Sequence, residues 1–401
     1  MDSAEREGLR QKGNVPILRF PEFQGEWEKM RLDAFTERVM RKNKNNLSQL
    51  PLTISAQYGL VDQVTFFNKV IASTDMSNYY LLKKGEFAYN KSYSSDYPWG
   101  AIKRLDRYDQ GALSSLYICF ALQDSIVSDY VLQYFESPKW HKGVSEIAVE
   151  GARNHGLLNV SVQDFFHTYH YVPKEKEEQI KIGKFLALLD ERIATQNKVI
   201  EDLKKLKCAI IETEYNGKGH ECRIGDIIEQ TSLRNKNNLV KTVLSVNNKL
   251  GFINQEEQFE DRAVASEDTS NYKVVTKDDF AYNPARINVG SIARLKSFNK
   301  GIVSPMYICF KVTDGIVPEY LESYFTTNRF FKEMQKRLEG SVRLCLSFEG
   351  LCNIPISIPC MDEQVEIGKR ICQIENMIET EYNILSLYEK QKLYLLRQML
   401  I

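Results

Sequence analysis

The sequence predicts an α+β fold in which two pseudo-symmetric domains of mixed helix and strand are joined by two long antiparallel coiled-coil helices. Three observations predict it. An internal repeat runs through the chain, each copy closes with an apolar heptad pattern, and short strand patterns fill the rest of each copy. The length of 401 residues leaves room for two to three domains with sizeable cores.

The repeat consists of five matched segments that occur in the same order in both copies. The pairs are RLDAFTERVMRKNKNN and RIGDIIEQTSLRNKNN (from Arg31 and Arg223), SNYYLLKKGEFAYN and SNYKVVTKDDFAYN (ending at Asn90 and Asn283), LYICF and MYICF, DYVLQYFES and EYLESYFTT, and EEQIKIGK and DEQVEIGK (from Glu177 and Asp362). Partner segments stay about 190 residues apart. The chain therefore contains two copies of one structural unit.

The first part of each copy has the pattern of short strands. Runs such as residues 52–55, 86–89 and 116–122 are rich in β-formers and are separated by Gly, Asn and Ser. Cys119 and Cys309 occupy equivalent positions in the middle of such a run, which favours a place in the core. None of the eight cysteines forms a Cys-x-x-Cys pair, so we expect buried thiols rather than a metal site.

The second part of each copy predicts a helix of about 40 residues, roughly 60 Å long, that begins after Pro173 or Pro359. Apolar residues recur at alternating spacings of four and three, which is the heptad seam of a coiled coil. The seams are Ile182, Leu186, Leu189, Ile193, Ile200 and Leu203 in the first helix, and Ile367, Ile371, Ile374, Ile378, Leu385 and Leu395 in the second. Polar breaks also coincide, with Gln196 matching Glu381 and Lys207 matching Lys392.

Two arrangements of these helices are open. Each helix can lie on its own mixed domain, or the two can pair with each other. We favour pairing, because one small domain cannot cover so long a helix. If a pseudo two-fold axis relates the copies, the helices run antiparallel and the heads lie at opposite ends. Such a molecule suits a partner with two sites at a fixed separation, and duplex DNA repeats every ~34 Å.

Charge and hydropathy restrict the class of protein. The chain has 53 basic and 53 acidic residues, and this balance alone argues against a nucleic-acid partner. No run approaches the ~20 apolar residues of a membrane span, and the polar first thirteen residues lack the apolar core of a secretory signal. We therefore expect a cytoplasmic protein.

No catalytic or metal-binding motif stands out. The chain has no G-x-x-x-x-G-K-[ST] loop and no G-x-G-x-x-G after a strand. The stretch from Tyr282 to Ala285, YNPA, lacks the second proline and the aromatic residue of the methyltransferase signature Asn-Pro-Pro-Tyr, and its counterpart YNKS in the first copy has no proline. His167 and His170 have no metal-ligand partners in the pattern, so we expect surface or core histidines.

Two sets of residues resemble the specificity subunits of Type I restriction-modification systems. The opening VPILRFPEFQGEW (residues 15–27), followed by Arg31 and Leu32, is similar to the amino-terminal signature of that family. The helical segments resemble its central and distal conserved regions through Pro173, Glu178, Gln179, Ile182, Gly183, Leu186, Asp190 and Ile193, and through Pro359, Glu363, Gln364, Ile367, Gly368, Ile371, Glu375 and Ile378. The family commonly has Leu-Gly-Asp where this chain has Leu32, Asp33 and Ala34.

The resemblance implies a non-catalytic subunit that recognises double-stranded DNA. Residues 15–172 and 217–358 would be target-recognition domains that each read half of a bipartite, asymmetric site. The helices at 173–216 and 359–401 would set the spacer and dock two modification (methyltransferase) subunits, with Glu178, Gln179, Glu363 and Gln364 as partner-binding residues. S-adenosylmethionine would belong to the modification subunits, and ATP and Mg²⁺ to the restriction subunits of the full complex.

Candidate DNA-binding residues were chosen for side chains that reach base edges or phosphates from loops. They are Lys42, Lys44, Lys91, Ser92, Tyr93, Trp99, Arg153, Asn154 and His155 in the first copy, and Arg234, Lys236, Arg286, Asn288, Arg294 and Arg343 in the second. Solvated turns and salt bridges within each head are the alternative for these residues. For the whole chain, the alternatives are a two-headed adaptor that binds proteins and an autonomous methyltransferase.

Overall fold

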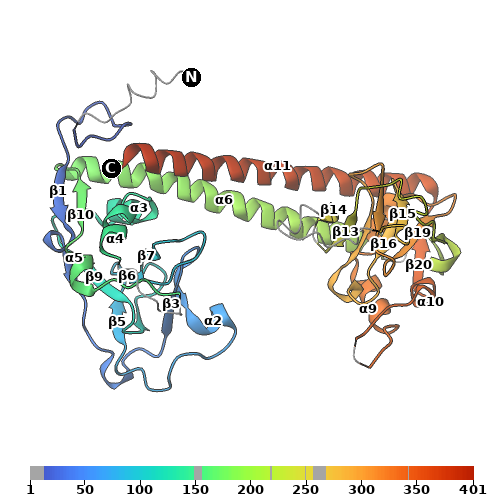
Figure 1. Cartoon of the computed structure of the whole chain (residues 1–401), viewed down its shortest axis with the longest axis horizontal. Helices are drawn as coiled ribbons and strands as arrows, with labels where there is room; N and C mark the ends of the chain where they lie inside the picture. The colour runs from blue at the N-terminus through green and yellow to red at the C-terminus, as the bar shows by residue number, and fades with distance from the viewer. Residues whose placement is uncertain (1–12, 149–155, 217–218, 249, 256–267, 342) are drawn as a thin grey trace. The chain divides into compact units, whose positions relative to one another are not determined.

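The structure is a computed structural model of the chain, and it describes residues 13–148, 156–216, 219–248, 250–255, 268–341 and 343–401. These residues form two compact units. Unit 1 comprises residues 1–197 and 384–401, and unit 2 comprises residues 198–383. The division falls inside both long helices, so each unit contains one mixed head and parts of both helices (Figure 1).

Head 1, residues 28–172, begins and ends with paired strands, β1 (Glu28–Arg31) and β10 (Tyr169–Val172). Two four-stranded sheets lie between them, with strand orders β2-β9-β6-β7 and β4-β3-β8-β5. Its other elements are η1 (Leu32–Ala34), β2 (Thr36–Arg38), η2 (Lys44–Asn46), β3 (Pro51–Ser55), β4 (Gly59–Asp62), α2 (Gln63–Phe67), β5 (Tyr80–Lys83), β6 (Phe87–Asn90), β7 (Ala101–Arg104), β8 (Gln110–Leu113), β9 (Ile118–Leu122), α3 (Ser128–Glu136), α4 (His141–Ile147) and α5 (Val162–Phe166).

Head 2, residues 220–358, repeats this plan. Its end strands β11 (His220–Arg223) and β20 (Pro355–Ile358) pair, and its four-stranded sheet has the order β12-β19-β16-β17. The remaining elements are η3 (Ile224–Asp226), β12 (Ile228–Thr231), β13 (Leu244–Asn247), β14 (Gly251–Asn254), β15 (Lys273–Thr276), β16 (Phe280–Tyr282), η4 (Ile287–Val289), β17 (Ile292–Arg294), β18 (Lys300–Val303), β19 (Ile308–Val312), α8 (Pro318–Tyr324), α9 (Asn328–Gln335) and α10 (Phe348–Cys352).

The two heads match in register as well as in order. Phe87 lies opposite Phe120 in head 1, and Phe280 lies opposite Phe310 in head 2. Both pairs stack, with ring centroids 5.4 Å and 5.1 Å apart. The predicted strands at residues 52–55, 86–89 and 116–122 correspond to β3, β6 and β9 within two residues. The repeat predicted from the sequence is therefore present in the structure.

The equivalent cysteines confirm the expected core position, whereas Cys208, Cys360 and Cys372 are exposed, so the expectation of buried thiols was wrong for them. Cys119 in β9 and Cys309 in β19 are both buried, and burial raises the pKa of each thiol to about 12. A thiol with so high a pKa stays protonated at neutral pH, and only the thiolate is a good nucleophile or metal ligand. These two cysteines are packing residues.

The long helices are α6 (Lys176–Glu214) and α11 (Met361–Met399), which begin three and two residues after the predicted prolines. They run antiparallel within each unit. In unit 1, Asp190 of α6 contacts Lys392 of α11, and the later residue Arg192 lies over the ring of the earlier residue Tyr388. In unit 2, Lys207 contacts Glu375 and Glu214 contacts the earlier residue Arg370. The predicted antiparallel pairing and the fold class are confirmed.

Most seam residues are buried. The buried ones are Ile182, Leu186, Leu189, Ile200, Ile367, Ile371, Ile374 and Leu385, while Ile193, Leu203, Ile378 and Leu395 are partly exposed. At the end of both helices the seam moves on by one residue, because Ile211 and Leu396 are buried where the heptad pattern predicts Ile210 and Leu395. Ile211 and Leu396 each belong to a core cluster that a head shares with both long helices, so the shift occurs where the helix pair packs against a head.

Candidate nucleic-acid interface

The repeated Glu-Gln motif joins each helix to its head. Gln179 accepts a hydrogen bond from Val127 N at 2.8 Å, and its amide donates to Pro173 O at 2.9 Å. Gln364 makes the same contacts in unit 2, with Val317 N at 2.9 Å and Pro359 O at 3.1 Å. Val127 and Val317 precede α3 and α8, so each glutamine fixes the start of a head helix against the start of a long helix.

The glycine of the same motif allows the helices to approach closely. A Cβ atom at Gly183 would lie 2.9 Å from the backbone nitrogen of Tyr130 in α3. A Cβ atom at Gly368 would lie 3.1 Å from Cβ of Glu319 in α8. The repeated sequence Glu-Gln-x-x-Ile-Gly therefore encodes the docking of each long helix on its own head.

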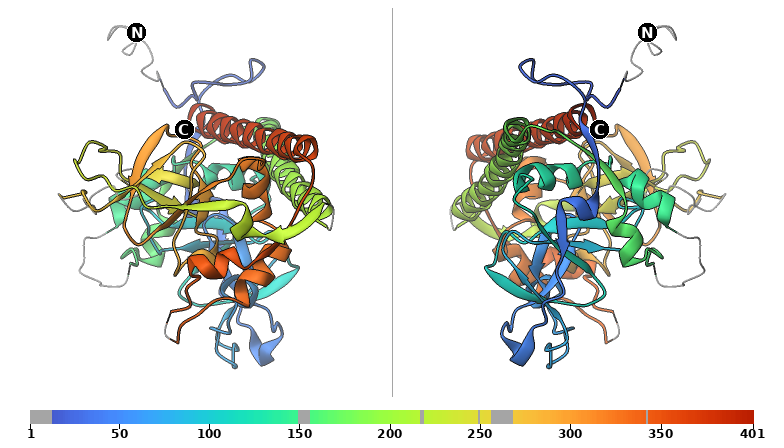
Figure 2. Two further views of the ribbon diagram at one scale, coloured as in Figure 1. Left: turned by 90° about the vertical axis from the view of Figure 1, so that its right-hand side faces the viewer. Right: turned by 90° about the vertical axis from the view of Figure 1, so that its left-hand side faces the viewer.

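The amino-terminal arm, residues 15–27, covers the first turns of α6. The Arg19 guanidinium donates to both carboxylate oxygens of Glu178, at 2.7 Å and 2.8 Å, and Trp27 Nε1 donates to the same carboxylate at 3.2 Å. Leu18 N donates to Gln398 O of α11 at 3.0 Å, so the arm also contacts the carboxyl-terminal helix of unit 1 (Figure 2).

These contacts correct the prediction for three of the four partner-binding residues. Glu178, Gln179 and Gln364 are at most 2% exposed, because the arm and the head cover them. They stabilise this chain internally and offer no surface to another subunit. Glu363, the counterpart of Glu178, is exposed, and its role stays a prediction.

The repeated run, KNKNN at residues 42–46 and RNKNN at residues 234–238, has a structural cause. Asn43 is fully buried; its amide donates to Ser48 O at 2.9 Å and its oxygen accepts from Ser48 N at 2.8 Å. Asn235 closes the equivalent loop through Val240 O at 2.9 Å and Val240 N at 3.1 Å. The asparagines hold the loop, so the similarity of the two runs reports loop geometry rather than a shared contact with a ligand.

The basic residues of these loops differ in their freedom. Lys42 donates to Asn78 O at 2.8 Å and lies over the Tyr80 ring, and Arg234 donates to Asn271 O at 3.1 Å. Lys44 and Lys236 are exposed at the outer side of their loops. Lys44 and Lys236 therefore offer the more available charges.

The loop after β6 presents an aromatic group. Tyr93 is 51% exposed, and the neighbouring Ser92 is exposed as well. Trp99 is partly buried against the core of head 1, and its carbonyl accepts a hydrogen bond from Tyr89 at 2.9 Å. Lys91 lies 3.4 Å from Val160 O. Trp99 thus supports the loop, while Ser92 and Tyr93 face solvent.

In head 2, Arg286, Asn288 and Arg343 are exposed. Arg286 and Asn288 lie in the loop after β16, the position that corresponds to the Tyr93 loop after β6 in head 1. The two loops therefore carry different side chains on one scaffold. Arg153, Asn154 and His155 lie outside the described residues.

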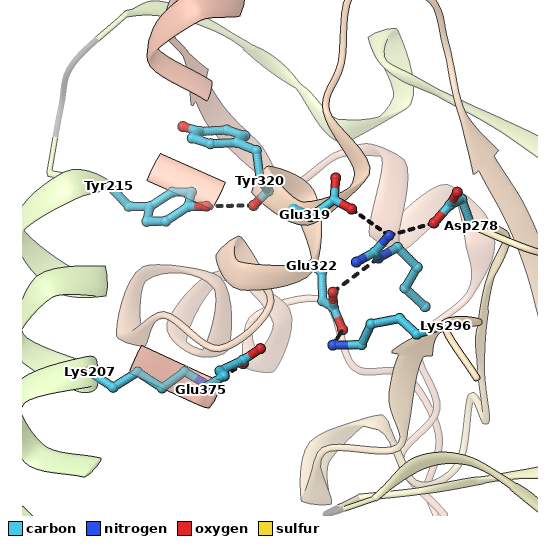
Figure 3. A network of polar contacts seen from close by, with 9 residues as sticks. Lys207, Tyr215, Asp278, Lys296, Glu319, Tyr320, Glu322 and Glu375 are labelled. Atoms are coloured by element: carbon cyan, nitrogen blue, oxygen red, sulfur yellow. Dashed lines mark hydrogen bonds and ion pairs between the residues drawn. The ribbon is translucent and has the colours of Figure 1, made fainter. Parts of the chain in front are cut away.

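Arg294 is not a DNA-binding residue in this structure, which corrects the prediction. Its side chain is 7% exposed, and its guanidinium lies 2.5 Å from Asp278, 2.7 Å from Glu319 and 3.0 Å from Glu322. Figure 3 labels these three acids. The counterpart in head 1, Arg104, pairs with Asp129 at 2.8 Å. Both arginines tie the edge strand of a sheet, β17 or β7, to the following helix. The sequence carried this signal, since the two arginines occupy equivalent positions.

The histidines behave as predicted. His167 is exposed, and His170 is buried in head 1. Tyr134 Oη lies 2.9 Å from His170 Nδ1, and Thr168 Oγ1 lies 2.8 Å from Nε2. Because the Thr168 hydroxyl donates to Phe165 O, it accepts from Nε2, which leaves Nδ1 to accept from Tyr134. Burial lowers the pKa of His170 to about 3, so the imidazole is neutral.

Sequence reasoning missed two features of unit 1. One is the arm contact between Arg19 and Glu178, which joins residues 159 positions apart. The other is an exposed aromatic group in α2 and in the turn before β4, where Phe66 contacts Tyr58 and Phe67 at centroid distances of 6.3 Å and 4.9 Å. The adjacent phenylalanines in a polar stretch were the available signal for the second.

The described residues contain no group of three or more His, Cys, Asp or Glu side chains that could hold a metal ion. None of the helices in the described ranges has an apolar stretch that could cross a membrane.

Comparison with protein families identifies head 2 with its flanking helical segment. Residues 218–387 match the Type I restriction modification DNA specificity domain. This part of the chain is therefore similar to a Type I DNA specificity domain. No curated protein matches the sequence. The specificity domain spans head 2 and most of α11, and head 1 repeats the same strand order.

Two solved structures share the fold over almost the whole chain. The S subunit of a Type-I restriction-modification system from M. genitalium has a TM-score of 0.52 and 15% identity, with 96% of this chain and 99% of that chain covered. A chain from a structure of complex assembly and conformational transition of the type I R-M system has a TM-score of 0.56 and 12% identity, covering 94% and 98%. Together with the specificity domain, this fold confirms the resemblance to specificity subunits and disfavours a two-headed protein adaptor.

Proposed function

We propose that the chain is the DNA sequence-recognition subunit of a Type I restriction-modification complex. Each head reads one half of a bipartite, asymmetric site, and the paired helices set the spacer and dock two modification subunits. The observation that carries this proposal is one scaffold, present twice, with different exposed side chains on equivalent loops. Ser92 and Tyr93 follow β6, whereas Arg286 and Asn288 follow β16. Two different half-sites need this combination of a common frame and divergent loops.

The described candidates divide into two kinds of contact. Arg286 can pair with guanine in bidentate geometry, and Asn288 with adenine. Lys44 and Lys236 project single charges, which suit phosphate and set the position of a head on the duplex. Arg343 and Tyr93 are exposed side chains that can reach either kind of group. Among the described residues, head 2 carries the bidentate candidates, and each head carries a lysine suited to phosphate.

The chemistry of the complex is assigned to other subunits. S-adenosylmethionine is bound by the modification subunits, and ATP with Mg²⁺ by the restriction subunits, in a cytoplasmic complex. The chain itself supplies recognition and performs no catalytic step. Its balance of 53 basic and 53 acidic residues gives little general attraction to phosphate. We therefore expect weak affinity for DNA when the chain is alone and strong, sequence-selective binding with the modification subunits.

Nuclease protection tests this function. The chain alone and the chain with its modification subunits are incubated with a DNA library, and protected fragments are sequenced. The expected result is a two-part footprint that needs the complex. If no selective footprint appears in either sample, the DNA reading is wrong. Saturable S-adenosylmethionine binding by the isolated chain would instead support an autonomous methyltransferase.

Exchange of one head tests the division of labour. Because β1 pairs with β10, the two ends of head 1 lie together, and residues 28–172 can be replaced by the head of another specificity subunit without disturbing the arm. Only one half of the recognised sequence should then change. The matched control exchanges residues 220–358, which are closed by β11 and β20 in the same way. A change in both halves after one exchange would contradict independent heads.

A further inference from the structure

The first turns of α6 and α11 are equivalent in the repeat but are covered differently. In unit 1, the arm lies on α6 through two neighbouring residues. Arg19 binds Glu178, and the Phe20 ring packs edge-on against Phe185 at 5.8 Å. Lys181 lies 4.5 Å above the Phe20 ring and also pairs with Glu22. Three side chains of α6, Glu178, Lys181 and Phe185, thus define how the Arg-Phe-Pro-Glu segment is held.

The same positions in α11 carry Glu363, Glu366 and Arg370, each 185 residues after Glu178, Lys181 and Phe185. The arginine-binding glutamate is therefore retained as Glu363. The position of the lysine carries the acidic Glu366, and the position of the phenylalanine carries the basic Arg370. Copy two has no segment equivalent to the arm, because only residues 215–219 separate α6 from β11. Among the residues that the structure describes, no segment equivalent to the arm covers the start of α11 in unit 2.

A hollow of about 230 Å³ lies at this place in unit 2, bordered by Glu214, Asp362, Glu363, Glu366 and Arg370. Arg370 is held by Glu214 at 2.6 Å. Among the described residues, Glu366 has only an exposed contact with Lys369 at 3.4 Å, and the Glu363 carboxylate has no hydrogen bond or ion pair. Four acids against one arginine make the hollow acidic.

We propose that this hollow, which we call the α11 groove, binds an extended segment of a partner subunit with the pattern arginine, aromatic residue, any residue, basic residue. The arginine binds Glu363 as Arg19 binds Glu178. The aromatic ring lies against the Arg370 guanidinium, as Phe20 lies against Phe185. The basic residue pairs with Glu366. In unit 1 the helix supplies the base, Lys181, and the arm supplies the acid, Glu22, so the charges are exchanged. Assignment of the partner to the same complex rests on the proposed function, whereas the binding preference does not.

The acidic Glu366, which stands where α6 has Lys181, favours such a partner over the arm of a second copy of the chain. The arm of a second copy would bring Glu22 to Glu366, and two like charges in contact disfavour binding. In unit 1 the arm is part of the same chain, so its high effective concentration keeps Glu178 occupied and a free peptide cannot compete there. A peptide added to the full chain therefore reports on the α11 groove.

Fluorescence anisotropy with labelled peptides tests the preference. The probes are VPILRFPK, the arm sequence with the last residue reversed in charge, and the native arm VPILRFPE. We expect VPILRFPK to bind about fivefold or more tightly than VPILRFPE at low salt, as one added charge-assisted pair predicts. Glu363→Gln should abolish binding of VPILRFPK, and Glu366→Lys should reverse the order of the two peptides. Glu379→Gln, an exposed acid on the same helix, is the matched control and should change nothing.

Two results would overturn the proposal. One is equal binding of both peptides to the native chain, and the other is unchanged binding to Glu363→Gln. The partner is identified with a photocrosslinking residue at the exposed position of Lys369 in the assembled complex. A crosslink to an arginine and aromatic segment of a modification subunit supports the assignment, and a crosslink only to a second copy refutes it. The footprint of the complex is read on the same samples, so failure of the groove and failure of the DNA function are distinguishable.

Discussion

Lys207 of α6 donates to Glu375 of α11, with 2.6 Å between Nζ and Oε1 (Figure 3). The equivalent pair in unit 1 joins Lys392 of α11 to Asp190 of α6. Both lysines interrupt the apolar seam at the same heptad position. Their partners Asp190 and Glu375 are also equivalent in the repeat, so the same ion pair is present in each unit. These pairs specify the antiparallel alignment of the helices within each unit, because a shift of one turn would leave the lysine against apolar residues.

Removal of the pair in unit 2 should cost little by itself. Lys207 is 25% exposed and Glu375 41% exposed, so a double-mutant cycle with Lys207→Ala and Glu375→Ala should give a coupling of about 0.5–1 kcal/mol in urea unfolding. High salt should reduce the coupling. The exposed pair between Lys205 and Glu201 is the control, and a larger coupling there would contradict the assigned role.

Gly183→Ala should destabilise unit 1. The added methyl group would lie 2.9 Å from the backbone of α3, and overpacking of this kind costs about 1–3 kcal/mol. Better helix propensity would return about 1 kcal/mol. Gly368→Ala should cost less, because its nearest neighbour is the Glu319 side chain at 3.1 Å. Thermal unfolding of both variants checks the order, and a gain in stability for Gly183→Ala would refute the close contact.

His170 predicts a loss of stability in acid. Its pKa is about 3 in the folded chain and about 6.5 when unfolded, so only the unfolded state binds the proton between these values. Stability contributed by neutral His170 is complete above pH 6.5 and falls as pH drops toward 3, by about 1.4 kcal/mol per pH unit. Urea unfolding at pH 7.5 and pH 5.5 measures this slope. His170→Gln should be less stable at both pH values and should lose this part of the slope.

Base reading by head 2 predicts selective defects. Arg286→Ala should weaken binding of the complex to its site by about 1–3 kcal/mol and relax the sequence preference in one half-site only. Lys44→Ala in head 1 should weaken binding to all sequences alike. It should also reduce the slope of log affinity against log salt concentration by about one, because one fewer counterion is released. Sequencing of bound DNA at two salt concentrations distinguishes these effects. Lys198→Ala on the exposed side of α6 is the control.

Spacer length should follow helix length. A heptad inserted after Asn197 in α6 and before Ile384 in α11 keeps the seam in phase and adds about 10 Å to the helix pair. The spacer of the recognised site should then lengthen by about three base pairs. An insertion of four residues in both helices should instead disrupt the seam and the folding of the chain. An unchanged spacer after the heptad insertion would show that the helices do not set it.

The repeat, the heptad seams and the buried cysteines were determined by the sequence alone. Each is a local periodicity or a match between copies, and such patterns depend only on spacing along the chain. Pro173 and Pro359 therefore predicted both helix starts to within three residues, and the heptads predicted the pairing of α6 with α11. The heptad pattern did not predict the one-residue shift of the seam to Ile211 and Leu396, because this shift depends on where a helix meets a head.

The roles of the charged and polar residues were decided by the tertiary structure. Glu178 and Glu363 are equivalent in the repeat, yet the arm buries the first and leaves the second exposed. Arg294 and Arg286 are both loop-side arginines in sequence, but three carboxylates surround only Arg294. A charged side chain is buried when partners from distant parts of the chain satisfy it, and exposed when they do not. Spacing along the sequence contains no information about those partners, and folding supplies it.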